Sequence, residues 1–275
     1  MKRLLVALLG FGMLAMIATS VPASAQSNGT VYVVHGIPGV TVDVYVNGTK
    51  TLSNFAPETV AGPLSLPAGP YTIKIYKAGA DPATATPVIN TTVQLPAGAD
   101  VSLVADLSAS GSPQLATFVN DTSAAPAGDG RLIVRHTADA PAVDILANGA
   151  KAFSDLVNGQ GDQANLAAGT VSASVVATGT TSPALIGPAN VNVVAGMATV
   201  VYAVGAPANG STASTLGVVT QQFPLAGSQM SVQAGTSGLL DRHAGLPAWA
   251  IAVLALAGLG LCGSAGSLLR SKARA

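Results

Sequence analysis

The sequence predicts an all-β protein, with two tandem immunoglobulin-like β-sandwich domains and one C-terminal transmembrane helix. An internal repeat of about 100 residues fills the middle of the chain. Short runs of alternating or β-branched residues, separated by turn motifs such as Asn47-Gly48, recur in both copies. Both ends of the chain carry an uncharged apolar segment. These three observations define the fold class, and about seven strands per copy suggest the immunoglobulin-like sandwich.

Composition excludes several classes of protein. The 275 residues include 12 basic and 12 acidic side chains, 9% charged residues and one cysteine. An average domain carries roughly a quarter charged residues. Disordered chains are poor in hydrophobic residues, a nucleic-acid partner needs a basic face, and a disulfide framework needs paired cysteines. We therefore expect a folded protein with no nucleic-acid partner and no stabilising disulfide.

Residues 1–25 read as a secretory signal peptide. Lys2 and Arg3 precede an apolar run over 4–18, and Ala23-Ser24-Ala25 supplies the small residues of a cleavage site. The run has about fifteen residues, whereas a retained membrane anchor needs about 20. Cleavage is therefore predicted after Ala25.

The repeat divides the next part of the chain into residues 26–120, a linker over 121–130 that is rich in Ala, Pro and Gly, and residues 131–226. Val-Tyr-Val-Val-His at 31–35 corresponds to Leu-Ile-Val-Arg-His at 132–136. The offset falls from 101 to 98 residues further on, as differences in loop length would produce. We expect strands in each copy, at 31–35, 42–46, 71–76, 91–95 and 101–105, and at 132–136, 143–147, 171–177, 191–194 and 198–204.

The C-terminal part reads as a flexible stalk over 227–243, a transmembrane helix over 246–269 and a basic tail over 270–275. The apolar segment is long enough to cross a hydrocarbon core of about 30 Å. The positive-inside rule places the tail in the cytoplasm and both domains outside. The predicted location is thus the cell membrane, with residues 246–269 in the cytoplasmic membrane. A rival reading is a sortase signal, but Trp249 and Ala250 replace the required Thr and Gly.

Removal of both ends exposes an acidic ectodomain. Residues 26–241 contain six basic residues and all twelve acidic residues, a net charge of −6. The neutral total of the whole chain conceals this imbalance.

The segment Ile133-Val-Arg-His-Thr-Ala-Asp-Ala-Pro-Ala-Val-Asp-Ile-Leu-Ala-Asn-Gly149 resembles the opening of the domain-of-unknown-function family numbered 4397. The first copy keeps His35, Val42, Asp43 and Asn47-Gly48, but has Pro-Gly-Val-Thr where the second has Asp-Ala-Pro-Ala. The resemblance covers both repeats. It implies a secreted or surface-attached β-sandwich module of bacterial envelope proteins, and brings no catalytic residue.

The recurrent polar residues are His35 with Asp43, and His136 with Asp144. Each pair could form a metal or acid/base site, because a carboxylate can orient an imidazole. Alternatively, the histidine closes its strand and the aspartate binds turn backbone. A zinc site needs three or four ligands, whereas each repeat offers one histidine and no cysteine. The structural interpretation is therefore favoured, and no metal site is assigned.

Asp139 and Asp144 could contribute to a calcium site, since hard cations take oxygen ligands, but a dense acidic loop is missing. No Gly-x-Ser-x-Gly elbow supports a hydrolase. We therefore assign no catalytic residue and no cofactor, and the candidates if a site exists are His35, Asp43, His136, Asp139 and Asp144.

Two functions remain open. The first is a non-enzymatic envelope protein that binds a protein or glycan partner or has a structural role. The second is an envelope hydrolase or metal-dependent enzyme with its site between the repeats. A transmembrane sensor is disfavoured because a tail of about six residues is too short to hold a signalling domain.

Overall fold

The computed structural model describes residues 27–208 and 213–227, and these residues form strands and loops without a helix. The all-β class predicted from the sequence is confirmed. Among the described residues, no helix has the length and apolar character to cross a membrane. The predicted signal peptide, transmembrane helix and basic tail lie outside the described residues, as does the predicted stalk beyond residue 227.

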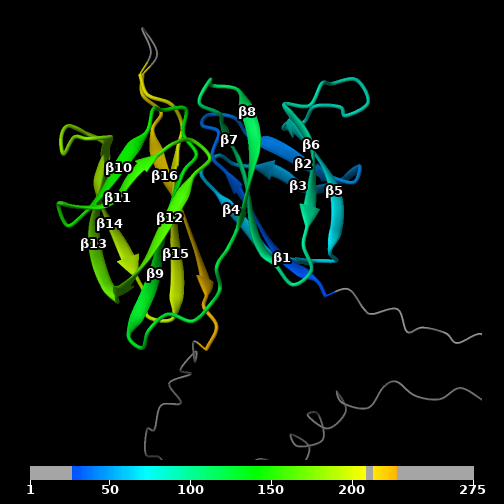
Figure 1. The fold of residues 1–275 in the computed structure, drawn as a ribbon. Coiled ribbons are helices and arrows are strands. Elements are labelled where there is room, and N and C mark those ends of the chain that lie inside the picture. The colour runs from blue at the N-terminus through cyan, green and yellow to red at the C-terminus, as the bar shows by residue number, and fades with distance from the viewer. Residues whose placement is uncertain (1–26, 209–212, 228–275) are drawn as a thin grey trace, which may run out of the picture. The chain divides into compact units, whose positions relative to one another are not determined.

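The first repeat contains two four-stranded sheets (Figure 1). One has the order β4-β1-β7-β8 and the other the order β3-β2-β5-β6. Strands β1 and β7 pair in parallel, and the other neighbours pair antiparallel. The strands are β1 (Gly29–His35), β2 (Val42–Val46), β3 (Thr49–Phe55), β4 (Val60–Leu66), β5 (Gly69–Lys77), β6 (Ile89–Leu95), β7 (Asp100–Leu107) and β8 (Pro113–Val119).

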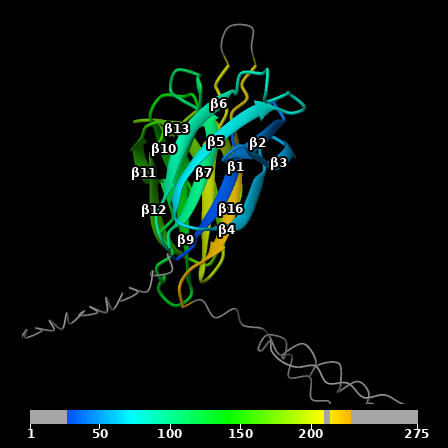
Figure 2. The ribbon, with the colours of Figure 1, turned by 90° about the vertical axis from the view of Figure 1, so that its right-hand side faces the viewer.

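The second repeat has the same arrangement, with sheets β12-β9-β15-β16 and β11-β10-β13-β14 and a parallel pair between β9 and β15. Its strands are β9 (Asp129–His136), β10 (Val143–Ala147), β11 (Ala150–Leu156), β12 (Gly161–Ala167), β13 (Gly169–Ala177), β14 (Ala184–Val193), β15 (Met197–Val204) and β16 (Gly217–Pro224). Figure 2 looks onto the first repeat, with the second behind it.

Each repeat has eight strands, one more than the approximate number expected from the sequence. The strand that is hardest to recognise from the sequence is β4, because Gly62 and Pro63 interrupt its pattern. Proline is tolerated in edge strands and at bulges, and β4 is an edge strand with a bulge opposite Tyr32. The second repeat also begins earlier than residue 131, since β9 starts at Asp129 inside the predicted linker.

Strands β1, β7, β9 and β15 are buried on both faces. In β1, Val31 and Val33 pack inside the first repeat, whereas Tyr32 and Val34 face the second. Strands buried on both sides read as continuous apolar runs rather than alternating ones. The sheets that contain these strands therefore pack against each other as well as against their own partners.

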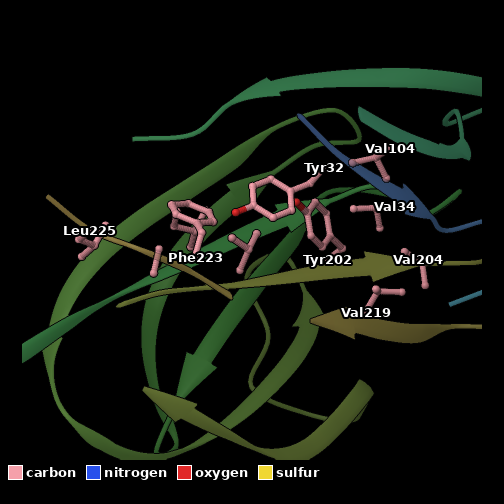
Figure 3. Packing of buried hydrophobic residues seen from close by; sticks show 11 residues of the cluster. Tyr32, Val34, Val104, Tyr202, Val204, Val219, Phe223 and Leu225 are labelled. Atoms are coloured by element: carbon pink, nitrogen blue, oxygen red, sulfur yellow. The ribbon is translucent and has the colours of Figure 1, made fainter. Parts of the chain in front are cut away.

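The interface between the repeats contains an apolar cluster. Figure 3 shows Tyr32 and Val34 of β1 beside Tyr202 and Val204 of β15, and the rings of Tyr32 and Phe223 lie 6.1 Å apart. Large apolar interfaces hold domains in one arrangement, whereas small polar ones permit motion. The two repeats thus form one packed unit of four sheets.

Candidate functional site

His35 ends β1 with its side chain fully buried. Its Nε2 lies 2.7 Å from the carbonyl oxygen of Val40, and its Nδ1 lies 3.4 Å from the backbone nitrogen of Ile37. A carbonyl can only accept and a backbone N–H can only donate, so the hydrogen bonds select the neutral ring with its proton on Nε2. Burial lowers the pKa of His35, and the bond to Val40 opposes that effect.

His136 has the same contacts in the second repeat. Its Nε2 lies 3.0 Å from the carbonyl oxygen of Pro141, and the N–H of Ala138 donates to its Nδ1 at 3.3 Å. In both repeats the imidazole holds the loop that leads from the first strand to the second. Both ring nitrogens are occupied, so neither is free to bind a metal or accept a proton from a substrate.

Asp43 organises a different part of the first repeat. Its Oδ1 accepts from the N–H of Asn54 at 2.8 Å, and its Oδ2 accepts from Lys50 Nζ at 2.8 Å and from the N–H of Gly79 at 3.2 Å. The Lys50 hydrogen bond, followed by that of Asn54, lowers the pKa of Asp43 against the opposing effect of burial. One buried carboxylate thus joins β2 to the bulge in β3 and to the loop after β5.

Asp144 repeats this arrangement. It accepts from the N–H groups of Asp155 and Gly179 at 3.0 and 2.9 Å, and pairs with Lys151. The hydrogen bond from Lys151, together with those from Asp155 and Gly179, lowers the pKa of Asp144 to about 2. The lysine that follows each aspartate by seven residues is therefore part of the same contact.

The histidine and the aspartate of each repeat are not brought together. Val42 and Val44 pack in the core between the sheets, so Asp43 between them points to the opposite face of its sheet. His35 lies in the other sheet, with its ring 5.6 Å from that of Phe55. The same alternation separates Asp144 from His136. No acid/base pair forms in either repeat.

Asp139 lies in the loop after β9, where its N–H donates to the carbonyl of Gly205 at 2.8 Å. Within residues 27–208 and 213–227, no group of three or more His, Cys, Asp and Glu side chains could hold a metal ion. The calcium and zinc alternatives therefore gain no support from the arrangement of these side chains.

The sequence did not predict the buried polar network between the repeats. Arg135 of β9 faces the first repeat and donates hydrogen bonds to Tyr202 Oη at 2.8 Å and Asn120 Oδ1 at 2.6 Å. Tyr202 and Ser102 both donate to Gln221 Oε1, at 2.6 and 3.0 Å. Burial lowers the pKa of Arg135, although its interactions with Tyr202 and Asp100 favour the charged form. The only sequence feature that could have indicated this network is Arg135, a charged residue within the apolar run 132–136.

A second buried group at the interface is Asp106, at the end of β7. Its Oδ2 accepts from Gln114 Nε2 at 3.3 Å, and its Oδ1 has no hydrogen-bond partner among the described residues. Gln114 also donates to Asn158 of the second repeat at 3.2 Å. Burial raises the pKa of Asp106 to about 7, against the opposing effect of the Gln114 hydrogen bond.

Two hollows differ in chemistry. An apolar cavity of about 310 Å³ lies between the sheets of the first repeat. A polar hollow of about 380 Å³ lies along β14, β15 and β16. It is lined by amide and hydroxyl residues and one valine, and by no histidine or carboxylate: Asn190, Val191, Asn192, Thr199, Thr220, Gln221 and Gln222. Neither of these hollows is lined by a candidate residue. A smaller apolar hollow of about 80 Å³ in the second repeat is lined by His136 but by none of the candidate aspartates.

The fold and these contacts define a class of all-β proteins with paired, similarly built sandwich units. The family model described as "Domain of unknown function (DUF4397)" matches residues 29–146, which supports the domain family that the motif around His136 resembles. The match spans the first repeat and the first two strands of the second. No curated protein matches the chain.

Proposed function

We propose that this protein is a non-enzymatic binding or structural module of the cell envelope. In this proposal, two immunoglobulin-like sandwiches are copies of one domain, exported by the signal over 1–25 and held outside the cytoplasmic membrane by the helix over 246–269. The main observation that supports this proposal is that both ring nitrogens of His35 and of His136 contact backbone atoms of the adjacent loop. The side chains best suited to catalysis are thereby used to hold loops.

The four-sheet packing supports a scaffold. The repeats share the apolar cluster around Tyr202 and Phe223 and are joined by the hydrogen bond from Arg135 to Asn120. Such an interface keeps the loop tips and outer sheet faces of both repeats at fixed positions. A fixed array of loops and sheet faces is suited to binding a protein or glycan partner.

The alternative is an envelope hydrolase or metal-dependent enzyme with a site between the repeats. That interface contains an apolar cluster and two buried ionisable side chains, Arg135 and Asp106. Arg135 is bonded to Tyr202 and Asn120. Asp106 accepts from Gln114, and among the described residues neither side chain is hydrogen-bonded to a histidine. Asp43 and Asp144, the recurrent candidates for an acid/base role, point away from the interior of their sandwiches. The observations therefore favour the binding or structural role.

The experiment that tests this proposal treats intact cells that produce the full chain with a membrane-impermeant biotin reagent. Lys74 and Lys77 should be labelled, whereas Lys272 in the tail should be labelled only after the cells are lysed. The purified full chain in lipid nanodiscs is then offered cell-wall glycan and envelope proteins as separate baits. Labelling of Lys272 in intact cells would overturn the topology, and turnover of envelope substrates that His136→Ala abolishes without a loss of folding would favour the enzyme.

A further inference from the structure

The two repeats differ in an apolar cavity that the first contains. It has a volume of about 310 Å³, against about 80 Å³ for the apolar hollow in the core of the second repeat. The larger cavity is lined on the interior by Val31, Val44, Ile75 and Leu103, and no charged side chain lines it. Apolar cavities stay dry and bind apolar molecules, and one of about 150 Å³ accepts benzene. The cavity here is large enough for a bigger apolar ligand.

The cavity reaches solvent between two edge strands. Strands β3 and β4 are the edges of opposite sheets, and both contribute to the lining. Thr51 and Ser65 are exposed there, whereas Leu52 and Leu64 are half-buried. Apolar side chains thus lead inward from a rim that carries hydroxyl groups.

A β-bulge shapes this entrance. Leu64 pairs with Val31 and Ala61 pairs with Val33, so Gly62 and Pro63 together oppose Tyr32. Ala61 and Leu64 both pack toward the core although they are three residues apart, which regular alternation forbids. Gly62 has φ +125°, and a Cβ there would lie 2.8 Å from the carbonyl oxygen of Val31. Bulges commonly occur beside functional sites, and the corresponding strand β12 pairs without one.

The second repeat fills the corresponding space. Leu52 pairs with Val44, and at the same register Phe153 pairs with Ile145. Phe153 is buried in the core of the second repeat with 4% of its surface exposed. The small hollow that remains there includes residues of the opposite edge strands, Ile186 of β14 and Val218 of β16. In the second repeat, the larger side chain of Phe153 on β11 and the regular edge strand β12 therefore close the corresponding entrance.

We propose that the first repeat binds an aliphatic chain, which enters between β3 and β4 and fills the cavity. The lining excludes a charged ligand, while Thr51 and Ser65 at the rim can solvate the polar end of an amphiphile. Tyr71 Oη donates to the carbonyl of Pro67 at 2.6 Å, which leaves the Tyr71 ring available to the chain. From the size of the benzene-binding cavity, the chain has on the order of ten carbon atoms. This inference rests on the proposed binding role and names its ligand class.

The test uses the full chain in lipid nanodiscs and an alkyl diazirine of about ten carbon atoms. After photolysis, mass spectrometry should locate the label on β3, β4 and β5. Leu52→Phe, which introduces the residue found in the second repeat, should reduce that labelling roughly tenfold without lowering Tm. Phe153→Leu is the matched control and should leave labelling of the first repeat unchanged. Thr51→Trp, at an exposed rim position, is the second blocking variant if Leu52→Phe fails to fold.

A parallel sample with a photoreactive phospholipid in the nanodisc distinguishes a membrane acyl chain from a free one. Labelling of the first repeat in either sample, reduced by the blocking variant, supports the proposal and identifies the source. Equal labelling in wild type and the blocking variant, or labelling confined to other strands, overturns it. That failure would leave the non-enzymatic envelope role standing, because biotin labelling and the His136→Ala variant test that role separately.

Discussion

The guanidinium carbon of Arg135 in the second repeat lies 4.5 Å from the centre of the Phe118 ring in the first. The Tyr202 ring lies 5.3 Å away, so the cation contacts two aromatic rings at the interface between the repeats. A cation over an aromatic face is attracted to the ring quadrupole, more strongly when it is removed from water. Through this contact and the hydrogen bond to Asn120, Arg135 links the two repeats.

Arg135→Ala should therefore lower the free energy of unfolding by about 2–4 kcal/mol, because it removes charged hydrogen bonds and the aromatic contacts. It should also weaken the coupling between the repeats. Urea denaturation followed by tyrosine fluorescence and by circular dichroism should change from one shared transition to two. Lys77→Ala, at an exposed position, serves as the control. A single, unshifted transition in Arg135→Ala would contradict this role.

Asp106 should make stability depend on pH near neutrality. Its pKa is raised to about 7 by burial, so the folded state favours the neutral carboxyl. The stabilisation from that neutral form is lost as the pH rises toward about 7, because the unfolded chain ionises near 4. Between about pH 5 and about pH 8, wild type should lose on the order of 2–3 kcal/mol relative to Asp106→Asn. Urea denaturation at several pH values measures the free energy of unfolding of both proteins. If wild type and Asp106→Asn show the same pH dependence, the prediction is refuted.

Asp144 and Lys151 should contribute unequally to the thermal stability of the protein, although they form one ion pair. Lys151 is 45% exposed, and exposed pairs contribute little. Asp144 also accepts from two backbone N–H groups, which Asp144→Ala would leave unpaired. Asp144→Ala should lower Tm by several degrees and Lys151→Ala much less. A comparable decrease in Tm for both variants would mean that the ion pair contributes more than the backbone hydrogen bonds, and would contradict this prediction.

The same carboxylate should make the second repeat sensitive to acid. The pKa of Asp144 is lowered to about 2, chiefly by the hydrogen bond from Lys151. Its contribution to stability is present above the unfolded pKa near 4 and is lost as the pH falls toward about 2. Thermal melts of wild type should therefore decline over this range, and those of Asp144→Ala should decline less. Equal declines would assign the acid sensitivity to other groups.

The local sequence pattern was sufficient to predict the all-β class. Alternation in β5 and the Asn47-Gly48 and Asn148-Gly149 turns indicate strands directly, since these signals are set by neighbouring residues. The strand positions expected in the first copy do not include β3, β4 or β8. In β4, Gly62 and Pro63 suggest a turn when the bulge is unknown. The burial of Arg135 depends on Phe118 and Asn120, which are distant in sequence. Such contacts follow from how the sheets stack, which spacing alone does not specify.

The cavity of the first repeat could not be predicted from the sequence either. Leu52 and Phe153 are both apolar strand residues, and only their positions in the sandwich show that one leaves a space that the other fills. The repeated His and Asp residues were found because both copies carry them. The sequence could not show that they point to different faces, which decides between a paired site and two separate loop contacts.

We propose that the recurrent histidines hold loops, and the thermal melt of His136→Ala tests this role most directly. The variant leaves the Pro141 carbonyl and the Ala138 N–H without their imidazole partner. We predict a Tm lower than that of wild type by about 5–10 °C, with the same difference in zinc and in EDTA. An unchanged melt accompanied by lost ligand binding, or a Tm that zinc raises only in wild type, would contradict the account.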